Sequence, residues 1–335
     1  MRRIALVLPV LALAGCGRRE PALDRDPGSA LDPKAEGVDV VSQEMWIQFA
    51  VSAAGLALVV GLLVWVVVRG VRRAPVEGDP TDDGGGMHWI LLGGVALPAV
   101  VLTLLFGVSV RSLAALSEPP GPVATINVIG HRWWWEVQYV GTPIETANEL
   151  VVPTGQPVRI RLISRDVIHS FWVPQLQRKL DLLPNEWNET WIEATESGVY
   201  RGVCSEFCGL QHARMHFLVR VLPVDEWRTW LGEASQPASK PVGSRARRGQ
   251  EVFLSTTCAY CHSIRGTPAG GWLGPDLTHV ASREALAGAT LPNNRGNLAG
   301  WITDPQHQKP GALMPRTLLE GDDLQVLLDY LQGLN

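Results

Sequence analysis

Two uninterrupted apolar segments constrain the fold of this chain more than any other feature. Met45–Val68 has 24 residues and Trp89–Val110 has 22, and neither contains Asp, Glu, Lys or Arg. As helices rising about 1.5 Å per residue, they would extend roughly 36 and 33 Å, enough to cross a hydrocarbon core of about 30 Å. Buried helices of a soluble core rarely run this far without a charge. The sequence therefore predicts a hairpin of two transmembrane helices within residues 44–111.

The charges around the hairpin predict its orientation. Arg69, Arg72 and Arg73 follow the first apolar segment, and the positive-inside rule places such a loop in the cytoplasm. Both ends of the chain, including residues 112–335, are then expected on the periplasmic or extracytoplasmic side of a bacterial inner membrane.

The N-terminus has the features of an export signal. Within residues 1–15, two arginines precede a short apolar stretch, and the sequence Leu-Ala-Gly-Cys that ends at Cys16 resembles a bacterial lipobox. This resemblance implies that Cys16 is lipidated after cleavage; an ordinary signal peptide with an incidental cysteine is the alternative. Residues 16–43 are rich in Asp, Pro, Gly and Arg and are expected to form an exposed tether.

Composition and cysteine spacing exclude several classes of protein. Hydrophobic residues make up 46% of the chain and charged residues 19%, which excludes an intrinsically disordered protein. A net charge of -4 argues against nucleic acid as a partner. Besides Cys16, the cysteines form a C-x3-C pair at 204 and 208 and a C-x2-C pair at 258 and 261, so none remains for a structural disulfide framework.

A candidate metal site follows a region that is typical of β structure. Residues 121–222 contain short segments of β-branched and aromatic residues between Gly and Pro, which favours an all-β sandwich or barrel. Residues 204–215, CSEFCGLQHARM, offer two thiols, an imidazole and a thioether, and His169 offers a second imidazole. Sulfur with imidazole selects copper, zinc or iron–sulfur clusters, and the thioether favours copper. These ligands suffice for two coppers bridged by both sulfurs; a zinc site or a disulfide is the alternative.

This region resembles the dinuclear copper (CuA) domain of cytochrome c oxidase subunit II. The resemblance rests on C-S-E-x-C-G-x-x-H-x-x-M, on the upstream D-V-x-H-S-F, on the G-H-R-W-W-W segment at 130–135, and on the hairpin ahead of the sandwich. It implies a cupredoxin-like fold for residues 112–232. It also implies the copper ligands: bridging thiolates from Cys204 and Cys208, His169 and Met215 on one copper, and His212 and the backbone carbonyl of Glu206 on the other.

Two further roles are implied by the same resemblance. The Glu206 side chain would reach a magnesium ion at the junction with the catalytic subunit, and Trp133 would be the residue at which electrons enter the copper centre. Core packing is the alternative for Trp133, because three adjacent tryptophans cannot all face one side of a strand. The family often has a carboxylate for proton uptake just before the second membrane helix, but Gly84–His88 contain none.

A second motif lies beyond a Ser-, Pro- and Ala-rich linker at residues 233–246. Cys258, Cys261 and His262 form the CxxCH signature of c-type haem attachment. The two thiols would form thioethers with haem c, and the imidazole would ligate its iron. A redox-active CxxC is the alternative.

Residues 247–335 resemble a small all-α cytochrome c domain. A helix-like run that contains Gly249 would cross a C-terminal amphipathic helix. Met314, within Leu-Met-Pro, would be the second axial ligand of the iron, and methionine ligation raises the haem potential. His279 and His307 are the competing candidates for this position.

Taken whole, the chain resembles subunit II of a haem-copper cytochrome c oxidase with a fused cytochrome c, the caa3-type arrangement. The resemblance implies that electrons from a soluble or membrane-bound cytochrome or other donor pass through haem c and the dinuclear copper to the haems of subunit I. Oxygen reduction and proton pumping would occur there, in complex with further oxidase subunits. The alternatives are the corresponding subunit of a CuA-containing nitric oxide reductase and a free-standing membrane-anchored electron carrier.

Overall fold

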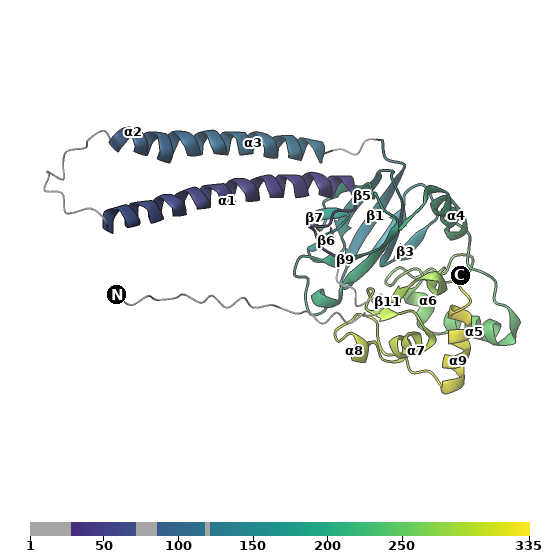
Figure 1. The fold of residues 1–335 in the computed structure, drawn as a ribbon. Coiled ribbons are helices and arrows are strands. Elements are labelled where there is room, and N and C mark those ends of the chain that lie inside the picture. The colour runs from purple at the N-terminus through teal and green to yellow at the C-terminus, as the bar shows by residue number, and fades with distance from the viewer. Residues whose placement is uncertain (1–27, 72–85, 118–120) are drawn as a thin grey trace.

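The computed structural model describes residues 28–71, 86–117 and 121–335. The expected signal peptide, Cys16 and the loop at 72–85 lie outside the described residues. Two helical segments lie side by side and project from a β-rich body (Figure 1). The first is α1 (Glu36–Val71); the second comprises α2 (Gly86–Leu91), the π-helical turn η1 (Leu92–Ala96) and α3 (Leu97–Ala115).

Both helical segments are long and apolar enough to cross a membrane, over Glu36–Gly70 and Gly86–Ala115. Their large apolar side chains are exposed along almost their whole length. Such a surface is unfavourable in water and favourable in lipid. The Ser109 hydroxyl donates a hydrogen bond to the Glu44 carboxylate and so joins the two helices. These features agree with the expected hairpin.

The segment before the first membrane helix differs from the expected tether. Over residues 28–43 the chain packs against the β-rich body: the Lys34 amide donates to the Gln175 carbonyl, and the Ala35 side chain is buried. Helix α1 begins at Glu36, well before the apolar run, because its first turns also rest on the body through Val38.

The body contains a sandwich of two five-stranded sheets, in the orders β3-β2-β1-β5-β8 and β4-β10-β9-β6-β7. The all-β sandwich expected from the sequence is confirmed. Its strands are β1 (Ala124–His131), β2 (Trp134–Tyr139), β3 (Glu145–Ala147), β4 (Glu149–Pro153), β5 (Val158–Ser164), β6 (His169–Val173), β7 (Gln177–Leu182), β8 (Asn188–Ile192), β9 (Gly198–Cys204) and β10 (His216–Leu222).

Alternation along the strands fills the space between the sheets. In β5 every second side chain is buried, as the period-2 geometry of a strand requires. Trp135, Phe171 and Phe217 form an aromatic cluster in this core, with the two phenylalanine rings stacked at 4.6 Å between centroids. Burial of three large aromatic side chains makes this cluster a major source of the sandwich's stability.

A helical domain follows the sandwich. Helix α4 (Val224–Ala234) packs on β4, and the C-terminal domain comprises α5 (Gly243–Ser255), α6 (Cys258–Cys261), η3 (Val280–Ser282), β11 (Ala285–Leu286), β12 (Leu291–Pro292), α7 (Arg295–Thr303), α8 (Pro305–Gln308) and α9 (Gly321–Leu331). A Cβ atom at Gly249 would lie 2.0 Å from the Val326 carbonyl oxygen. Helices α5 and α9 therefore cross as closely as glycine permits.

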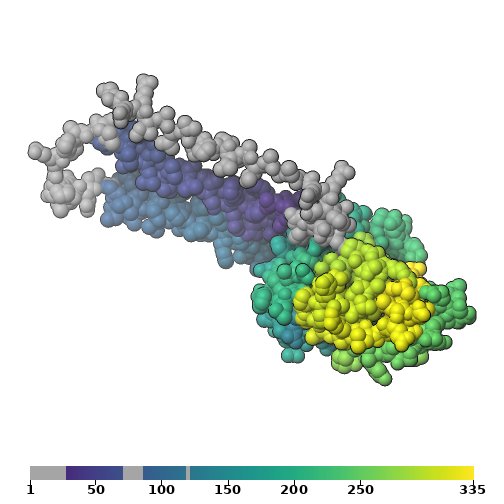
Figure 2. Space-filling view, turned by 90° about the horizontal axis from the view of Figure 1, so that it is seen from below, coloured from purple at the N-terminus to yellow at the C-terminus, as the bar shows by residue number. Residues whose placement is uncertain are grey.

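The connection between the two domains is short. Helix α4 ends at Ala234 and α5 begins at Gly243, so the non-helical connection covers residues 235–242 rather than 233–246. The C-terminal domain, green to yellow in Figure 2, lies directly against the sandwich. Direct contact between the domains was not expected from the composition of the linker.

Candidate metal centres

Neighbouring strands bring the first candidate ligands together. His169 begins β6 and Cys204 ends β9, and these strands pair with Phe171 opposite Cys204. The chain then loops through Cys208 and the short helix η2 (His212–Arg214), and Met215 immediately precedes β10. The ligand atoms therefore converge at one end of the sheet.

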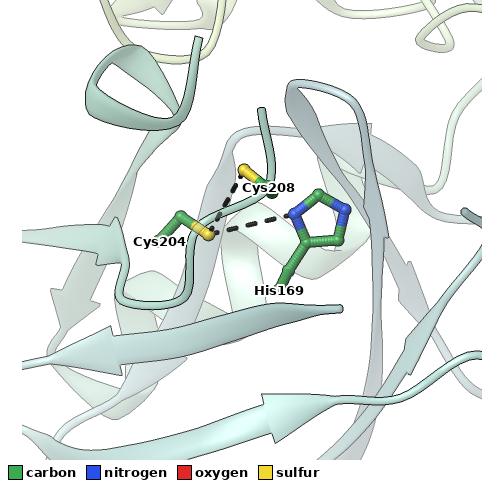
Figure 3. A group of neighbouring side chains, drawn as sticks. All are labelled: His169, Cys204 and Cys208. Atoms are coloured by element: carbon green, nitrogen blue, oxygen red, sulfur yellow. Dashed lines mark hydrogen bonds between the residues drawn. The ribbon is translucent and has the colours of Figure 1, made fainter. Parts of the chain in front are cut away.

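The convergence is close enough for shared metal coordination. His169, Cys204 and Cys208 are buried, and their ligand atoms lie within 4.8 Å of one another (Figure 3). The two sulfur atoms, Cys204 Sγ and Cys208 Sγ, lie 3.8 Å apart. Cys204 Sγ lies 3.9 Å from His169 Nδ1 and 3.2 Å from the Glu206 carbonyl oxygen. Cys208 Sγ lies 3.7 Å from His212 Nδ1 and 3.8 Å from Met215 Sδ.

The electrostatics of the site favour a thiolate. The hydrogen bond between the two cysteine side chains lowers the pKa of Cys204 and raises the pKa of Cys208, so Cys204 loses its proton first. Burial opposes a charge on His169, but hydrogen bonds to Asp166 and Cys204 outweigh it and raise the pKa of this imidazole. The Asp166 carboxylate accepts at 2.8 Å from Nε2, which turns Nδ1 toward the sulfurs.

The donor set fits copper better than zinc. Two adjacent thiols, two imidazoles and a thioether form a soft set with more donors than the four that a structural zinc uses. The Met215 side chain is fully buried with its sulfur against Cys208. A pair of copper ions would use all of these donors.

The three consecutive tryptophans have different surroundings. Trp135 is buried in the sandwich core, and Trp134 stacks on His131 with 4.3 Å between ring centroids. Trp133 precedes β2, so it lies outside the strand alternation. Its indole Nε1 donates to the Cys208 carbonyl at 3.0 Å, and the residue also lines a cavity in the C-terminal domain.

That cavity is the second candidate site. It is lined mainly by apolar side chains, with Cys258, Cys261, His262 and Met314 among the lining residues. His262 Nδ1 lies 2.7 Å from the Pro275 carbonyl, which fixes the ring and leaves Nε2 for another partner. Burial lowers the pKa of His262, so the ring is neutral, the form that ligates a metal.

The wall of the cavity leaves room for the His262 imidazole. A Cβ atom at Gly274 would lie 2.7 Å from Cε1 of His262, so glycine leaves room for the imidazole beside the cavity wall. His279 and His307, the competing axial candidates, are not among the lining residues. The His279 ring instead lies 3.1 Å from the Gln236 carbonyl oxygen.

The Glu206 carboxylate lies apart from the other candidate ligands, and Asp166 and Lys309 have contacts that were not predicted from the sequence. Glu206 is exposed, and the metal-binding cluster of the described residues does not include its carboxylate. Asp166 orients His169 and was missed, although a carboxylate three residues before a ligand histidine is a usable signal. Lys309 was also missed: it is buried between the domains, and nothing in the sequence distinguishes it from a surface lysine.

The fold and the two sites define a membrane-anchored electron-transfer protein, with a cupredoxin-like sandwich and a cytochrome c-type domain. Residues 140–222 match the family described as "Cytochrome C oxidase subunit II, periplasmic domain", and residues 246–335 match "Cytochrome c". These families imply CuA copper in the sandwich and haem c in the helical domain.

Similarity to curated relatives extends over nearly the whole chain. The chain is 32% identical to "Cytochrome c oxidase subunit 2" of Alkalihalophilus pseudofirmus, over 99% of this chain and 96% of the relative. It is also 32% identical to the protein of the same name from Bacillus sp. strain PS3, over 97% and 94%. The chain therefore belongs to the cytochrome c oxidase subunit 2 family and is part of an oxidoreductase complex.

A solved structure is similar over about a third of the chain. The periplasmic domain of subunit II of cytochrome oxidase from Bradyrhizobium japonicum is 32% identical, with 35% of this chain and 96% of that chain covered and a TM-score of 0.34.

Proposed function

We propose that this chain is the subunit at which electrons enter a caa3-type haem-copper oxidase. Electrons from an external donor would pass through its own haem c and dinuclear copper to the haems of subunit I, which reduces oxygen to water and pumps protons. When bound, haem c and the copper pair each supply reversible one-electron chemistry.

The residues of this chain hold and align these two centres. Cys258 and Cys261 would bind haem c covalently, and His262 and Met314 would ligate its iron. The copper pair would be held by His169, Cys204, Cys208, His212, Met215 and the Glu206 carbonyl, as their convergence supports.

One observation carries the proposal. Trp133 lines the cavity that contains the CxxCH motif and donates a hydrogen bond to the carbonyl of Cys208. A single residue therefore contacts both sites. This placement favours Trp133 as the residue through which electrons enter the copper centre.

The topology of the chain completes the proposal. Residues 1–15 would be removed as a signal peptide, and Cys16 would carry the lipid. Residues 44–111 would anchor the chain as a hairpin, with the copper domain (112–234), the linker (235–242) and the cytochrome c domain (243–335) on the extracytoplasmic side. The exposed Glu206 carboxylate would reach magnesium at the junction with subunit I.

Purification of the intact complex tests this function. We expect the chain to co-purify with subunit I, to contain two coppers and one covalent haem c, and to support oxygen consumption. One copper per chain, or haem that acid extraction removes, would contradict the assigned sites. Consumption of nitric oxide instead of oxygen would assign the chain to the reductase alternative, and a chain that runs alone in a detergent extract would favour a free-standing carrier.

A further inference from the structure

The interface between the copper domain and the cytochrome c domain contains a buried lysine. Lys309 follows α8 in the cytochrome c domain and is only 3% exposed. Its side-chain amino group, whose pKa burial lowers to about 7, donates to the Trp133 carbonyl of the copper domain at 2.7 Å and to the Ala287 carbonyl of its own domain at 3.2 Å. Within the part of the chain that the structure describes, no carboxylate forms an ion pair with it.

An ammonium group in this position is costly unless its hydrogen bonds are good. Removing a charge from water without a partner is strongly unfavourable, and the carbonyl oxygens offset this cost only while the domains remain together. A tether alone would leave Lys309 in solvent. The contact therefore belongs to one defined arrangement of the domains.

Further hydrogen bonds cross the interface around Lys309. The side chains of Gln211 and Arg214, in the copper-ligand loop, donate to the carbonyls of Pro310 and Gln308 on either side of the lysine. Side chains of each domain thus donate hydrogen bonds to backbone carbonyls of the other domain. The segment that leads to Met314 is held against the loop that carries the copper ligands.

Three separate contacts define the place of Trp133. Its carbonyl accepts from Lys309, its indole donates to the Cys208 carbonyl, and the residue lines the cavity of the cytochrome c domain. Lys309 therefore holds the backbone of the residue that lies between the two sites. Neither contact of Lys309 involves a candidate copper or haem ligand.

We infer that Lys309 is a positioning residue, which locks the cytochrome c domain onto the copper domain with Trp133 aligned between their redox centres. The inference rests on the proposed function, because it concerns transfer between those centres. The two domains are then aligned by the contact of Lys309 with Trp133 and not by the linker.

The test uses the intact oxidase complex with Lys309→Met, which keeps the length and apolar stem of the side chain but removes the donor. Lys240→Met, at an exposed position of the connection between the domains, is the matched control. Two quantities are measured: the rate of transfer from haem c to copper after flash reduction, and hydrogen exchange of the His216 amide, which is bonded across the interface to the Gly288 carbonyl. The potentials and spectra of both centres are recorded alongside.

Small displacements of aligned groups have large effects on rates, so we expect Lys309→Met to slow the transfer by about tenfold or more. The His216 amide should exchange faster because the interface opens more often. The spectra and potentials should stay unchanged, and Lys240→Met should behave as wild type.

Unchanged transfer and unchanged exchange in Lys309→Met would overturn the inference. If that variant loses haem or copper, Lys309→Leu, which also lacks the donor but has a shorter side chain, replaces it with the same two measurements; wild-type values there would also overturn the inference. A wild-type complex without transfer from haem c to copper would refute the proposed function instead.

Discussion

Electron transfer from haem c to copper within this chain should depend little on ionic strength. The copper domain, residues 121–235, has 10 Lys+Arg and 13 Asp+Glu, a net charge of -3, whereas residues 244–335 have 8 of each and a net charge of 0. Charge therefore attracts the two domains only weakly. The structure adds that they already lie in contact through hydrogen bonds at buried positions.

The size of the salt effect follows from one ion pair. Among the described residues, only Arg220 and Glu284 form an ion pair across the interface, at 3.6 Å and with both side chains partly exposed. Such pairs contribute about 0.2–1 kcal/mol. Complete screening would then change the ratio of docked to undocked domains by at most about fivefold. Buried contacts such as that of Lys309 are screened much less.

The assay is flash-induced oxidation of haem c in the intact complex over a range of salt concentrations. Glu284→Gln should change the rate of haem c oxidation at every salt concentration by as little as high salt changes it in wild type. Glu251→Gln, at an exposed position of α5, is the control and should leave the rate unchanged. A tenfold slowing between low and physiological salt would show that exposed charges organise the domains, and the reasoning from buried contacts would be wrong.

Three further outcomes are expected. Cys208→Ser should abolish the delocalised mixed-valence copper spectrum because a hydroxyl is a poor bridge, whereas Met215→Leu should keep both coppers and shift the potential; equal copper loss in both would contradict the assignment. Gly249→Ala should lower the unfolding free energy of the cytochrome c domain by about 1–3 kcal/mol, since its Cβ would clash with α9; unchanged thermal unfolding would contradict this. Burial raises the pKa of Glu149 from 4.5 to about 7, so its ionisation weakens the fold as pH rises through that value. Wild type should therefore lose roughly 3 kcal/mol relative to Glu149→Gln between acid and alkaline pH, and a difference that stays constant would refute this.

Residue type and spacing predicted the parts of this protein whose chemistry is local. The length of an uncharged apolar run is enough to predict whether it can span a membrane. The CxxCH motif brings two thiols and an imidazole together within five consecutive residues. The copper site needed one long-range link, from His169 to Cys204. The pairing of β6 with β9 supplies it, and only the resemblance to a known family predicted it.

Contacts that depend on tertiary packing were not predictable. The charged sequence around the start of α1 is typical of a tether. Its residues Ala35 and Val38 are nevertheless buried, because they pack on a surface formed by residues more than 130 positions later, around Gln175 and Ala194. Strand alternation could not assign the three tryptophans, because Trp133 lies between β1 and β2, where alternation does not apply. Composition describes the connection between the domains but carries no information about their docking.

The loop at 204–215 shows why the two redox sites cannot be treated as separate modules. Its candidate ligands His212 and Met215 point inward to the sulfurs, while Gln211 and Arg214, the residues directly before them, reach outward to the cytochrome c domain. One backbone conformation therefore places the copper ligands and the docking contacts together. On the proposed function, a change that reshapes this loop would alter both the copper site and the alignment of Trp133, so the linker would provide proximity and the loop the geometry of transfer.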